Sequence, residues 1–308
     1  MTALAEFSLE KRIGRGSYGD IFLAAGPDGP AAIKVLRADR QTPQMTSRFR
    51  AEVAALEKVG GHPFVVSLKC PLREVAEGGM YYAMEYLPGG TLDSLVRTGG
   101  YGLGLVLSVA AGLAEGLARI HQTGLLHRDL CLKNVLLDGQ GGARISDFGL
   151  CRATEQEEGA TPDFWFAHGD PECASPERLF HIESGEMGDV YSLGAVLYSL
   201  LTRRSLFTLS ELAFLYSIYT RQVEQFFRTC IQHQLPCPTI DFRAVYDHYL
   251  KTSPELRLNP LAVEASRDQL AGLSEVVTDL VEPDYWRRLK RFGSLEAVAA
   301  RLRELGAV

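Results

Sequence analysis

The sequence lacks several features that mark specialised classes of protein. It has no surplus of positive charge, because 32 lysine and arginine residues face 38 acidic ones and the formal charge is −6. This excludes an electrostatic reason to bind nucleic acid or an anionic membrane. It also shows no internal repeat and no low-complexity tail. The remaining composition, 46% hydrophobic and 23% charged over 308 residues, is typical of one large globular domain or of two lobes.

Long apolar runs are missing as well. We find no run of 18 apolar residues, and residues 1–6 contain neither a basic segment nor a long apolar one. The sequence therefore predicts no membrane span and no signal peptide. With neither membrane nor nucleic acid expected as a partner, we expect a cytoplasmic location.

Cysteines are few, and their spacing does not suggest a metal site. The six cysteines stand at positions 70, 131, 151, 173, 230 and 237, and none forms a C-x-x-C pair. We expect free thiols in a non-secreted chain. Cys131, Cys151 and Cys173 fall in or beside the site described below. We interpret them as core or loop filler; redox control, the alternative, needs an exposed thiol of low pKa.

One stretch carries more chemistry than any other. Residues 127–134 read H-R-D-L-C-L-K-N, which places Asp129, Lys133 and Asn134 within six residues. A short apolar run, a glycine-rich turn and a second run follow, and then Asp147-Phe148-Gly149. This pattern predicts a hairpin that brings Asn134 and Asp147 to the same end of two paired strands. Two hard oxygen ligands held in this way suit Mg²⁺.

A second motif, G-x-G-x-x-G, occupies residues 14–19. A dinucleotide-binding fold would need a helix to begin at these glycines. Here residues 20–25 and 31–36 instead resemble two strands joined by a glycine and proline turn. The glycines are therefore expected in a hairpin, where their backbone N–H groups can approach phosphates. A plain glycine turn is the alternative for the loop alone, but Lys34 on the second strand argues against it.

Together, H-R-D-x-x-x-x-N, D-F-G, the glycine motif and the strand Ala32-Ile33-Lys34 resemble the Hanks-type serine/threonine protein kinase superfamily. The resemblance implies an α+β, bilobal fold. Residues 1–87 would form a small antiparallel β lobe with one helix, and residues 88–308 a larger, mainly α lobe. It also implies ATP and Mg²⁺ as cofactors, transfer of the γ-phosphate to serine or threonine hydroxyls of proteins, and autophosphorylation.

The resemblance assigns catalytic roles to four residues. Asp129 would orient the acceptor hydroxyl and take its proton, and Lys34 would grip the α- and β-phosphates. Glu52 would pair with Lys34 from a helix predicted over about 46–59, where it fits better than Glu57; a solvated helix edge is the alternative. Lys133 would stabilise phosphate charge.

The resemblance also implies a nucleotide site. Asn134 and Asp147 would hold the metal, Met84 would be the gatekeeper, and the backbone of Glu85 and Leu87 would contact adenine. The residues expected at the nucleotide are Ile13, Gly14, Gly16, Gly19, Ile21, Ala32, Lys34, Met84, Glu85, Leu87, Asn134, Leu136 and Asp147.

Two departures from the family pattern bear on the acceptor. Serine/threonine kinases usually place a lysine where Cys131 stands, whereas Lys133 occupies the position of an arginine in tyrosine kinases. Asp170 replaces the family's threonine in the segment 169–177. We expect an active enzyme with Lys133 as its working cation. The alternatives are a pseudokinase scaffold that binds nucleotide or partners, a tyrosine or dual-specificity kinase, and a kinase of small molecules.

Further elements follow along the chain. We predict strands over 65–68 and 80–87, a hinge over 87–90, and helices over 104–122, 189–201 and 295–305. Asp189 would cap its helix, anchor the loop that carries Asp129, or both. Either Arg287 or Arg288 would pair with Glu177.

Two segments point to regulation. Because Arg128 precedes Asp129, the resemblance implies phosphorylation of the loop after Gly149, at Thr154 or Thr161; alternatively, the glutamates at 155, 157 and 158 supply a permanent charge. Residues 203–275 match the family least and are rich in aromatic residues. Core packing is the default interpretation for them, and a docking surface for a regulatory partner is the alternative.

Overall fold

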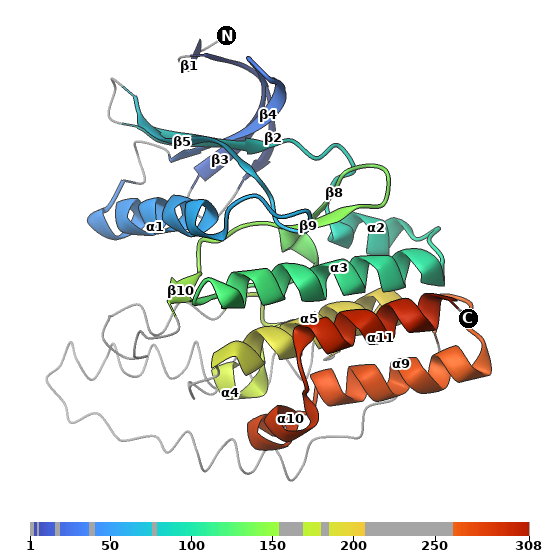
Figure 1. The fold of residues 1–308 in the computed structure, drawn as a ribbon. Coiled ribbons are helices and arrows are strands. Elements are labelled where there is room, and N and C mark those ends of the chain that lie inside the picture. Colours follow the sequence, from blue (N-terminus) through green and yellow to red (C-terminus); the bar gives the residue numbers. More distant parts are fainter. Residues whose placement is uncertain are drawn as a thin grey trace, which may run out of the picture.

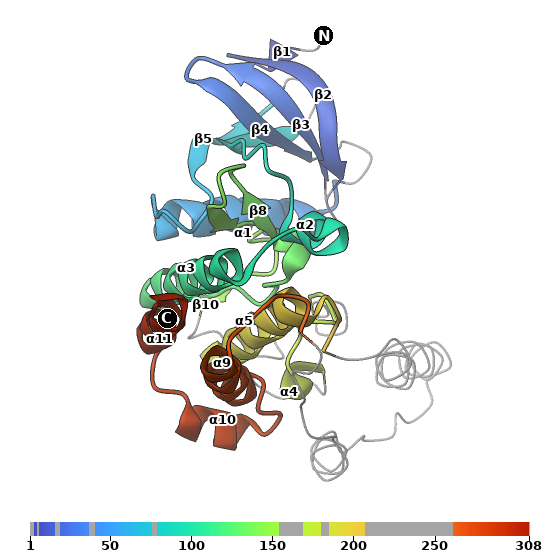
Figure 2. The ribbon, with the colours of Figure 1, turned by 90° about the vertical axis from the view of Figure 1, so that its right-hand side faces the viewer.

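The computed structural model describes residues 3–4, 6–15, 19–36, 41–75, 79–153, 169–179, 185–206 and 261–307. These residues form one lobe built on an antiparallel sheet and a second lobe made mainly of helices (Figure 1). Helix α1 lies between the sheet and the helical lobe (Figure 2). The predicted α+β, bilobal architecture is confirmed; the exact lobe boundary at 87/88 stays a prediction.

Six strands form the sheet of the first lobe, in the order β1-β2-β3-β4-β6-β5. Their pairing is antiparallel throughout, and β3 and β4 pair without a break from Gly19 opposite Leu36 to Gly26 opposite Gly29. The glycine motif therefore leads into a hairpin, as predicted, and not into a helix. The strands are β1 Ala3–Leu4, β2 Phe7–Arg15, β3 Gly19–Gly26, β4 Gly29–Leu36, β5 Leu68–Glu74 and β6 Met80–Glu85.

Two details of the predicted sheet were wrong. Strand β1 was not expected, because two residues are too short to show an alternating pattern. The strand expected over 65–68 begins only at Leu68. Val65 and Val66 are buried apolar residues that pair with the helical lobe instead, where the Val66 N–H donates to the Ile145 carbonyl at 2.9 Å.

Helix α1, Pro43–Val59, begins earlier than predicted. The Thr42 hydroxyl accepts a hydrogen bond from the Met45 N–H at 3.2 Å, and a proline stands in the first turn, where its missing N–H costs nothing. The other end is tied to the helical lobe, because Arg119 donates two hydrogen bonds to the Val59 carbonyl, at 2.9 and 2.7 Å. Both ends of the helix are thus defined by side chains that satisfy its free backbone groups.

The second lobe is arranged around helix α3, with α5 and α11 beside it (Figures 1 and 2). The closing helix was predicted correctly, and Leu295, Leu302 and Leu305 of α11 are buried. The helices are α2 Leu92–Thr98, α3 Leu103–Gln122, α4 Pro176–Leu179, α5 Gly185–Thr202, α9 Arg267–Leu280, α10 Tyr285–Arg291 and α11 Leu295–Ala307. Short elements complete the lobe: β7 Leu125–Leu126, the 3₁₀ turn η2 Leu132–Asn134, β8 Val135–Leu137, β9 Ala143–Ile145 and β10 Arg152–Ala153.

Helix α3 is, by length and composition, apolar enough to cross a membrane, although it contains no uninterrupted run of 18 apolar residues. Of its most apolar 18-residue window, 67% is buried inside the protein. The central place of α3, packed against α5, β9 and α11, explains why it is apolar on nearly every side.

Several predictions fall outside the described residues. They concern Gly16 in the glycine motif, Thr154 and Thr161 in the loop after Gly149, and the glutamates of that loop. The aromatic segment 203–275 is described only at 203–206 and 261–275. These expectations stay predictions.

Candidate active site

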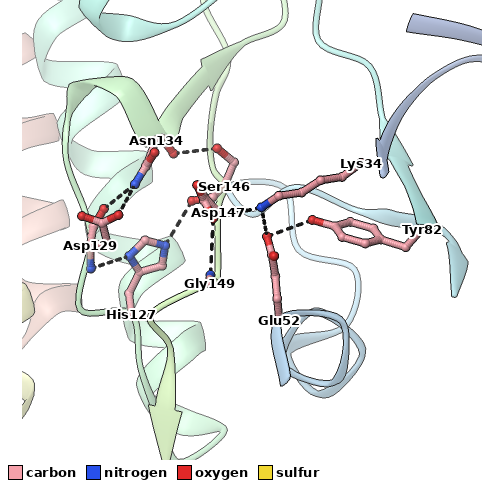
Figure 3. Close-up of polar contacts among 9 residues, drawn as sticks. All are labelled: Lys34, Glu52, Tyr82, His127, Asp129, Asn134, Ser146, Asp147 and Gly149. Atoms are coloured by element: carbon pink, nitrogen blue, oxygen red, sulfur yellow. Dashed lines mark hydrogen bonds and ion pairs between the residues drawn. The ribbon is translucent and has the colours of Figure 1, made fainter. Parts of the chain in front are cut away.

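The hairpin of β8 and β9 brings two predicted metal ligands together. Val135 lies opposite Ile145, and the Ser146 N–H donates to the Asn134 carbonyl at 2.8 Å. Asn134 comes directly before Val135, and Asp147 comes two residues after Ile145. Both residues therefore lie at the same end of the hairpin, as the spacing predicted (Figure 3).

Lys34 joins the sheet lobe to the helical lobe at this point. Its Nζ lies 2.6 Å from Glu52 Oε1 and 3.2 Å from Asp147 Oδ1 (Figure 3). The side chains of Lys34 and Glu52 are only 3% and 1% exposed. Glu57, by contrast, is exposed. The surroundings of Glu52 are therefore a buried ion pair and not a solvated helix edge.

The pKa shifts of these three groups follow from burial and from their charges. Burial alone would lower the pKa of Lys34, but the charges of Glu52 and Asp147 outweigh it, so that the pKa lies well above its usual value. Burial raises the pKa of Glu52 despite the opposing charge of Lys34. Burial would also raise the pKa of Asp147, but Lys34 and the Gly149 N–H hold it below its usual value. One buried cation therefore pairs with two carboxylates, Glu52, which is buried, and Asp147, which is partly exposed.

Tyr82 is a member of this cluster that the sequence analysis missed. Its hydroxyl donates to Glu52 Oε1 at 2.9 Å (Figure 3). Tyr82 lies directly opposite Lys34 in the β4–β6 pairing, so both side chains project from the same face of the sheet. The alternation of side chains along a strand could have identified it. Tyr82 stands two residues before Met84, the predicted gatekeeper, and therefore lies on the same face of the strand.

Asp129 is held by hydrogen bonds from two sides. Asn134 Nδ2 donates to its Oδ2 and to its backbone carbonyl, both at 2.8 Å, and the Asp170 N–H donates to its Oδ1 at 2.8 Å. Gly169 permits this approach, because its φ is +74° and a Cβ there would lie 2.6 Å from Asp129 Oδ1. Burial raises the pKa of Asp129, which suits a carboxylate that accepts a proton.

Asp189 anchors the loop that carries Asp129. Its Oδ2 accepts from the His127 N–H at 2.8 Å, and its Oδ1 accepts from the Arg128 N–H at 2.7 Å. Burial would raise the pKa of Asp189, but a hydrogen bond from His121 outweighs it and lowers the pKa to about 2. Asp189 lies inside α5, which begins at Gly185, so the expected capping role was wrong. The contacts are those of an anchor for the loop backbone.

The two residues that depart from the family pattern lie together. Lys133 Nζ is 2.7 Å from Asp170 Oδ2, and this hydrogen bond raises the pKa of Lys133. The Lys133 side chain is 61% exposed. Its ammonium is therefore available from solvent and is paired with Asp170, whose backbone N–H binds Asp129.

The cysteines near the site have the surroundings of structural thiols. Cys131 and Cys173 are buried, and Cys151 is partly buried. Burial raises the pKa of all three thiols, that of Cys151 to about 12. A reactive cysteine needs the opposite shift and exposure, so these contacts favour core and loop filler over redox control.

A buried ion pair fixes the segment that contains Asp170. Glu177 and Arg288 are paired, and neither side chain is exposed to solvent. Arg287, the other candidate, is 70% exposed and lies near Asp284. The alternative left open by position in the sequence is thus resolved in favour of Arg288.

The residues expected around a nucleotide lie on both lobes. Ala32 and Met84 are buried and face each other across β4 and β6. Ile21 and Leu136 are partly buried, whereas Ile13 is 40% exposed. Lys34, Asn134 and Asp147 form the polar side described above.

The two described glycines of the motif differ in what requires them. A Cβ at Gly19 would lie 2.2 Å from the Val35 carbonyl oxygen, so the close approach of two strands excludes any larger residue there. A Cβ at Gly14 would only touch Ile21 at 3.6 Å, an ordinary contact. The protein alone therefore does not require glycine at position 14, which is compatible with close approach of a ligand to the backbone.

The oxygen atoms left over by these contacts fit a magnesium ion. Asn134 uses its amide nitrogen for Asp129, which leaves its amide oxygen as a ligand. Lys34 and the Gly149 N–H both bind Asp147 Oδ1, and the side chain is 37% exposed. Within the described ranges, no group of three His, Cys, Asp or Glu residues could hold a metal. A site with two oxygen ligands suits Mg²⁺, which completes its shell with phosphate oxygens and water.

Comparisons with known proteins agree with this geometry. The family model described as "Protein kinase domain" matches residues 7–277. The chain is 35% identical over 210 residues to the serine/threonine-protein kinase PkaB of Streptomyces coelicolor. This match covers 64% of the chain and 48% of PkaB. The chain is 33% identical over 201 residues to PknK of Mycobacterium tuberculosis, covering 64% and 18%, and 30% identical over 212 residues to protein kinase C epsilon type of Rattus norvegicus, covering 64% and 27%. The chain spans less than half the length of these relatives.

Proposed function

The chain belongs to the protein kinase domain family, and on this premise we propose that it transfers the γ-phosphate of Mg·ATP to serine or threonine hydroxyls of protein substrates. The observation that carries the proposal is the contact of Lys34 with Glu52 and Asp147, at 2.6 and 3.2 Å. These three residues come from β4, α1 and the end of the β8–β9 hairpin. Phosphoryl transfer depends on such positioning and on charge stabilisation more than on covalent chemistry.

The acceptor hydroxyl would lie at Asp129. This carboxylate orients the hydroxyl and takes its proton while the oxygen bonds to the γ-phosphorus and ADP departs. Asn134 and the Asp170 N–H keep the carboxylate in place through their hydrogen bonds. Lys34 holds the α- and β-phosphates, and Lys133 stabilises charge near the acceptor. When bound by Asn134 and Asp147, Mg²⁺ supplies further charge neutralisation at the phosphates.

Adenine would lie between the two lobes, against Ala32, Met84 and Leu136. The Glu85 N–H already donates to the Ser67 carbonyl at 2.9 Å. A contact from Glu85 to adenine is therefore left to its carbonyl, and the matching backbone contact would come from Leu87.

The choice of serine or threonine as acceptor is supported by the names of the bacterial relatives, PknK and PkaB. The pairing of Lys133 with Asp170 supports an active enzyme, because the two departures from the family pattern compensate each other in charge. A scaffold without activity would have no need for this arrangement beside Asp129.

The test is an incubation of the purified chain with Mg·ATP and generic protein substrates, followed by mass spectrometry of the products. We expect phosphate on serine or threonine, and a loss of about 10²–10⁴-fold in Asp129→Asn, the range that general base catalysis supplies. Nucleotide binding without any transfer would support a pseudokinase instead, and phosphate on tyrosine would overturn the acceptor class.

We also propose autophosphorylation in the loop after Gly149. The presence of Arg128 before Asp129, and of Thr154 and Thr161 in that loop, supports it. Intact mass measured before and after ATP treatment provides the test. A fully active protein that carries no phosphate would contradict this part of the proposal. A regulatory partner for residues 203–275 and a cytoplasmic location stay proposals.

A further inference from the structure

The carboxylate of Glu52 accepts hydrogen bonds from two donors, and both bind the same oxygen atom. Lys34 Nζ and the Tyr82 hydroxyl both bind Oε1, at 2.6 and 2.9 Å. The other oxygen, Oε2, is buried and has no hydrogen-bond partner in the described part of the chain. Losing either donor would therefore remove half of the polar contacts that hold this buried carboxylate.

Tyr82 connects helix α1 to the interior of the sheet. It lies in β6, in the interior of the six-stranded sheet, directly opposite Lys34 of β4. Its ring packs on Phe49 of α1 with a centroid distance of 5.3 Å, and its hydroxyl binds Glu52 of the same helix. Tyr82 thus contacts α1 at two residues on its buried face.

Charge makes the hydroxyl more important than an ordinary hydrogen bond. The groups that face Glu52 are Lys34 from β4, Tyr82 from β6 and Asp147 from the end of the β8–β9 hairpin. Burial and the charge of Asp147 both favour the protonated form of Glu52, whereas the hydrogen bond from Tyr82 favours the ionised form. Tyr82 itself remains a donor, because burial raises the pKa of its hydroxyl well above the usual value.

We propose that Tyr82 is a positioning residue, whose hydroxyl holds Glu52 and with it helix α1 against Lys34 before nucleotide binds. The consequence for phosphoryl transfer rests on the proposed function, since it requires that Lys34 act on phosphates. The assembly of α1 does not rest on it.

The first test uses the protein without nucleotide. Hydrogen–deuterium exchange is compared for the wild type, for Tyr82→Phe, and for Tyr81→Phe as a matched control. Tyr81 is the neighbouring residue, only 3% exposed, and packs in the separate apolar cluster on the other face of the sheet. Both substitutions remove one oxygen and keep the ring, and circular dichroism checks that both variants fold. We expect faster exchange across residues 43–59 in Tyr82→Phe only. Equal exchange in all three proteins would overturn the proposal.

The second test is kinetic. For Tyr82→Phe we expect kcat/KM for ATP to fall about 10- to 150-fold, the effect of losing one hydrogen bond to a charged group. We also expect the acid limb of the plot of kcat/KM against pH to move to higher pH in this variant, because Glu52 becomes easier to protonate. Tyr81→Phe should keep the wild-type profile. A lower rate with an unshifted acid limb would indicate a structural role alone and contradict the proposal.

The two tests separate the two proposals. If the wild type transfers no phosphate, the proposed function fails, while the exchange experiment still decides whether Tyr82 positions α1. If the wild type is active and the two tyrosine variants behave alike in exchange and in pH profile, the inference about Tyr82 fails and the proposed function stands.

Discussion

At the scale of single residues, the arrangement of the site follows from a balance of charges around the buried ammonium of Lys34. Lys34 is the one ammonium within contact of both Glu52 and Asp147 among the residues placed in the structure. Asp129 lies beyond them, and hydrogen bonds from the Asn134 amide and the Asp170 N–H hold its carboxylate. Asp147, proposed to bind the metal, and Asp129, proposed to accept the proton, therefore have different surroundings, and these shift their pKa values in opposite directions.

The raised pKa of Asp129 predicts the acid side of the pH profile. The ionised carboxylate is the form that accepts the proton, so activity should fall as the pH drops through its pKa. Because this pKa lies above the usual value for aspartate, the loss should begin at a higher pH than for an ordinary carboxylate. The measurement is kcat/KM for the protein substrate against pH, at saturating Mg·ATP. An acid limb at or below the usual value for aspartate would contradict the assignment of Asp129 as the base.

Lys133 supports a second prediction at this scale. Replacing it with methionine keeps an unbranched side chain but removes the ammonium that pairs with Asp170, so we expect turnover to fall about tenfold or more. Lys133→Arg keeps the charge and serves as the matched control. Steady-state kinetics with saturating substrates measure the effect. Turnover of Lys133→Met equal to that of the wild type would show that this residue is not the working cation.

At the scale of elements, much of the structure follows from local pattern. The hairpin that carries Asn134 and Asp147 was predictable because apolar runs flank a glycine-rich turn, and α3 was predictable from its periodicity and closing glycine. The late start of β5 was not, since Val65 and Val66 are as apolar as strand residues but pair with Ile145 of the other lobe. Long-range contacts of this kind leave no local signal.

The same limit applies to the site. Sequence motifs named Lys34, Glu52, Asp129, Asn134 and Asp147, and the structure brings them together. Tyr82 belongs to none of these motifs, because its contact with Glu52 depends on the register between β4 and β6. The choice of Arg288 over Arg287 likewise depends on which face of α10 is buried.

The anchor between α5 and the loop 127–134 yields a prediction at the element scale. In Asp189→Asn, one acceptor oxygen becomes an NH₂ group facing an N–H donor of His127 or Arg128. We expect a loss of about 1–3 kcal/mol in the free energy of unfolding, the cost of an unsatisfied buried polar group. Urea denaturation measures it. A midpoint unchanged from that of the wild type would contradict the anchoring role.

Asp189 also contributes to acid stability, and the sign follows from its pKa. The folded value of about 2 lies below the usual value of 3.8. Its stabilising contribution is therefore fully present above pH 3.8 and is lost as the pH falls through 2. The difference between these two pKa values corresponds to about 2 kcal/mol in the free energy of unfolding. The difference in the free energy of unfolding between the wild type and Asp189→Asn should therefore become smaller as the pH falls from 3.8 to about 2.

At the scale of the whole molecule, contacts between residues far apart in the chain hold the site together. Lys34 and Asp147 are 113 positions apart, and Glu177 and Arg288 are 111 apart. The first contact joins the two lobes. The second joins the segment that contains Asp170 to helix α10 near the end of the chain. The acceptor side of the site therefore depends on a helix that contributes no residue to it.

The pair of Glu177 and Arg288 makes this dependence testable. Arg288→Met leaves a fully buried carboxylate without its cation, which should lower the free energy of unfolding by about 3–5 kcal/mol. Arg287→Met is the matched control, because this neighbour is 70% exposed, and its effect should stay within about 0.5 kcal/mol. Denaturant unfolding of both variants gives the comparison. Equal losses in the two variants would show that the buried pair is not what secures this segment.

The central claim is that one site, assembled from both lobes, carries the γ-phosphate of ATP to a protein hydroxyl. The most direct measurement supplies ATP labelled either at the γ- or at the α-phosphorus, with Mg²⁺ and a protein substrate, and follows the label. We predict that the γ-label appears on serine or threonine, that the α-label stays in the nucleotide, and that Asp129→Asn slows the transfer by about 10²–10⁴-fold. A wild-type chain that binds ATP but leaves the γ-label off every protein, or that labels proteins equally well without Asp129, would contradict the account.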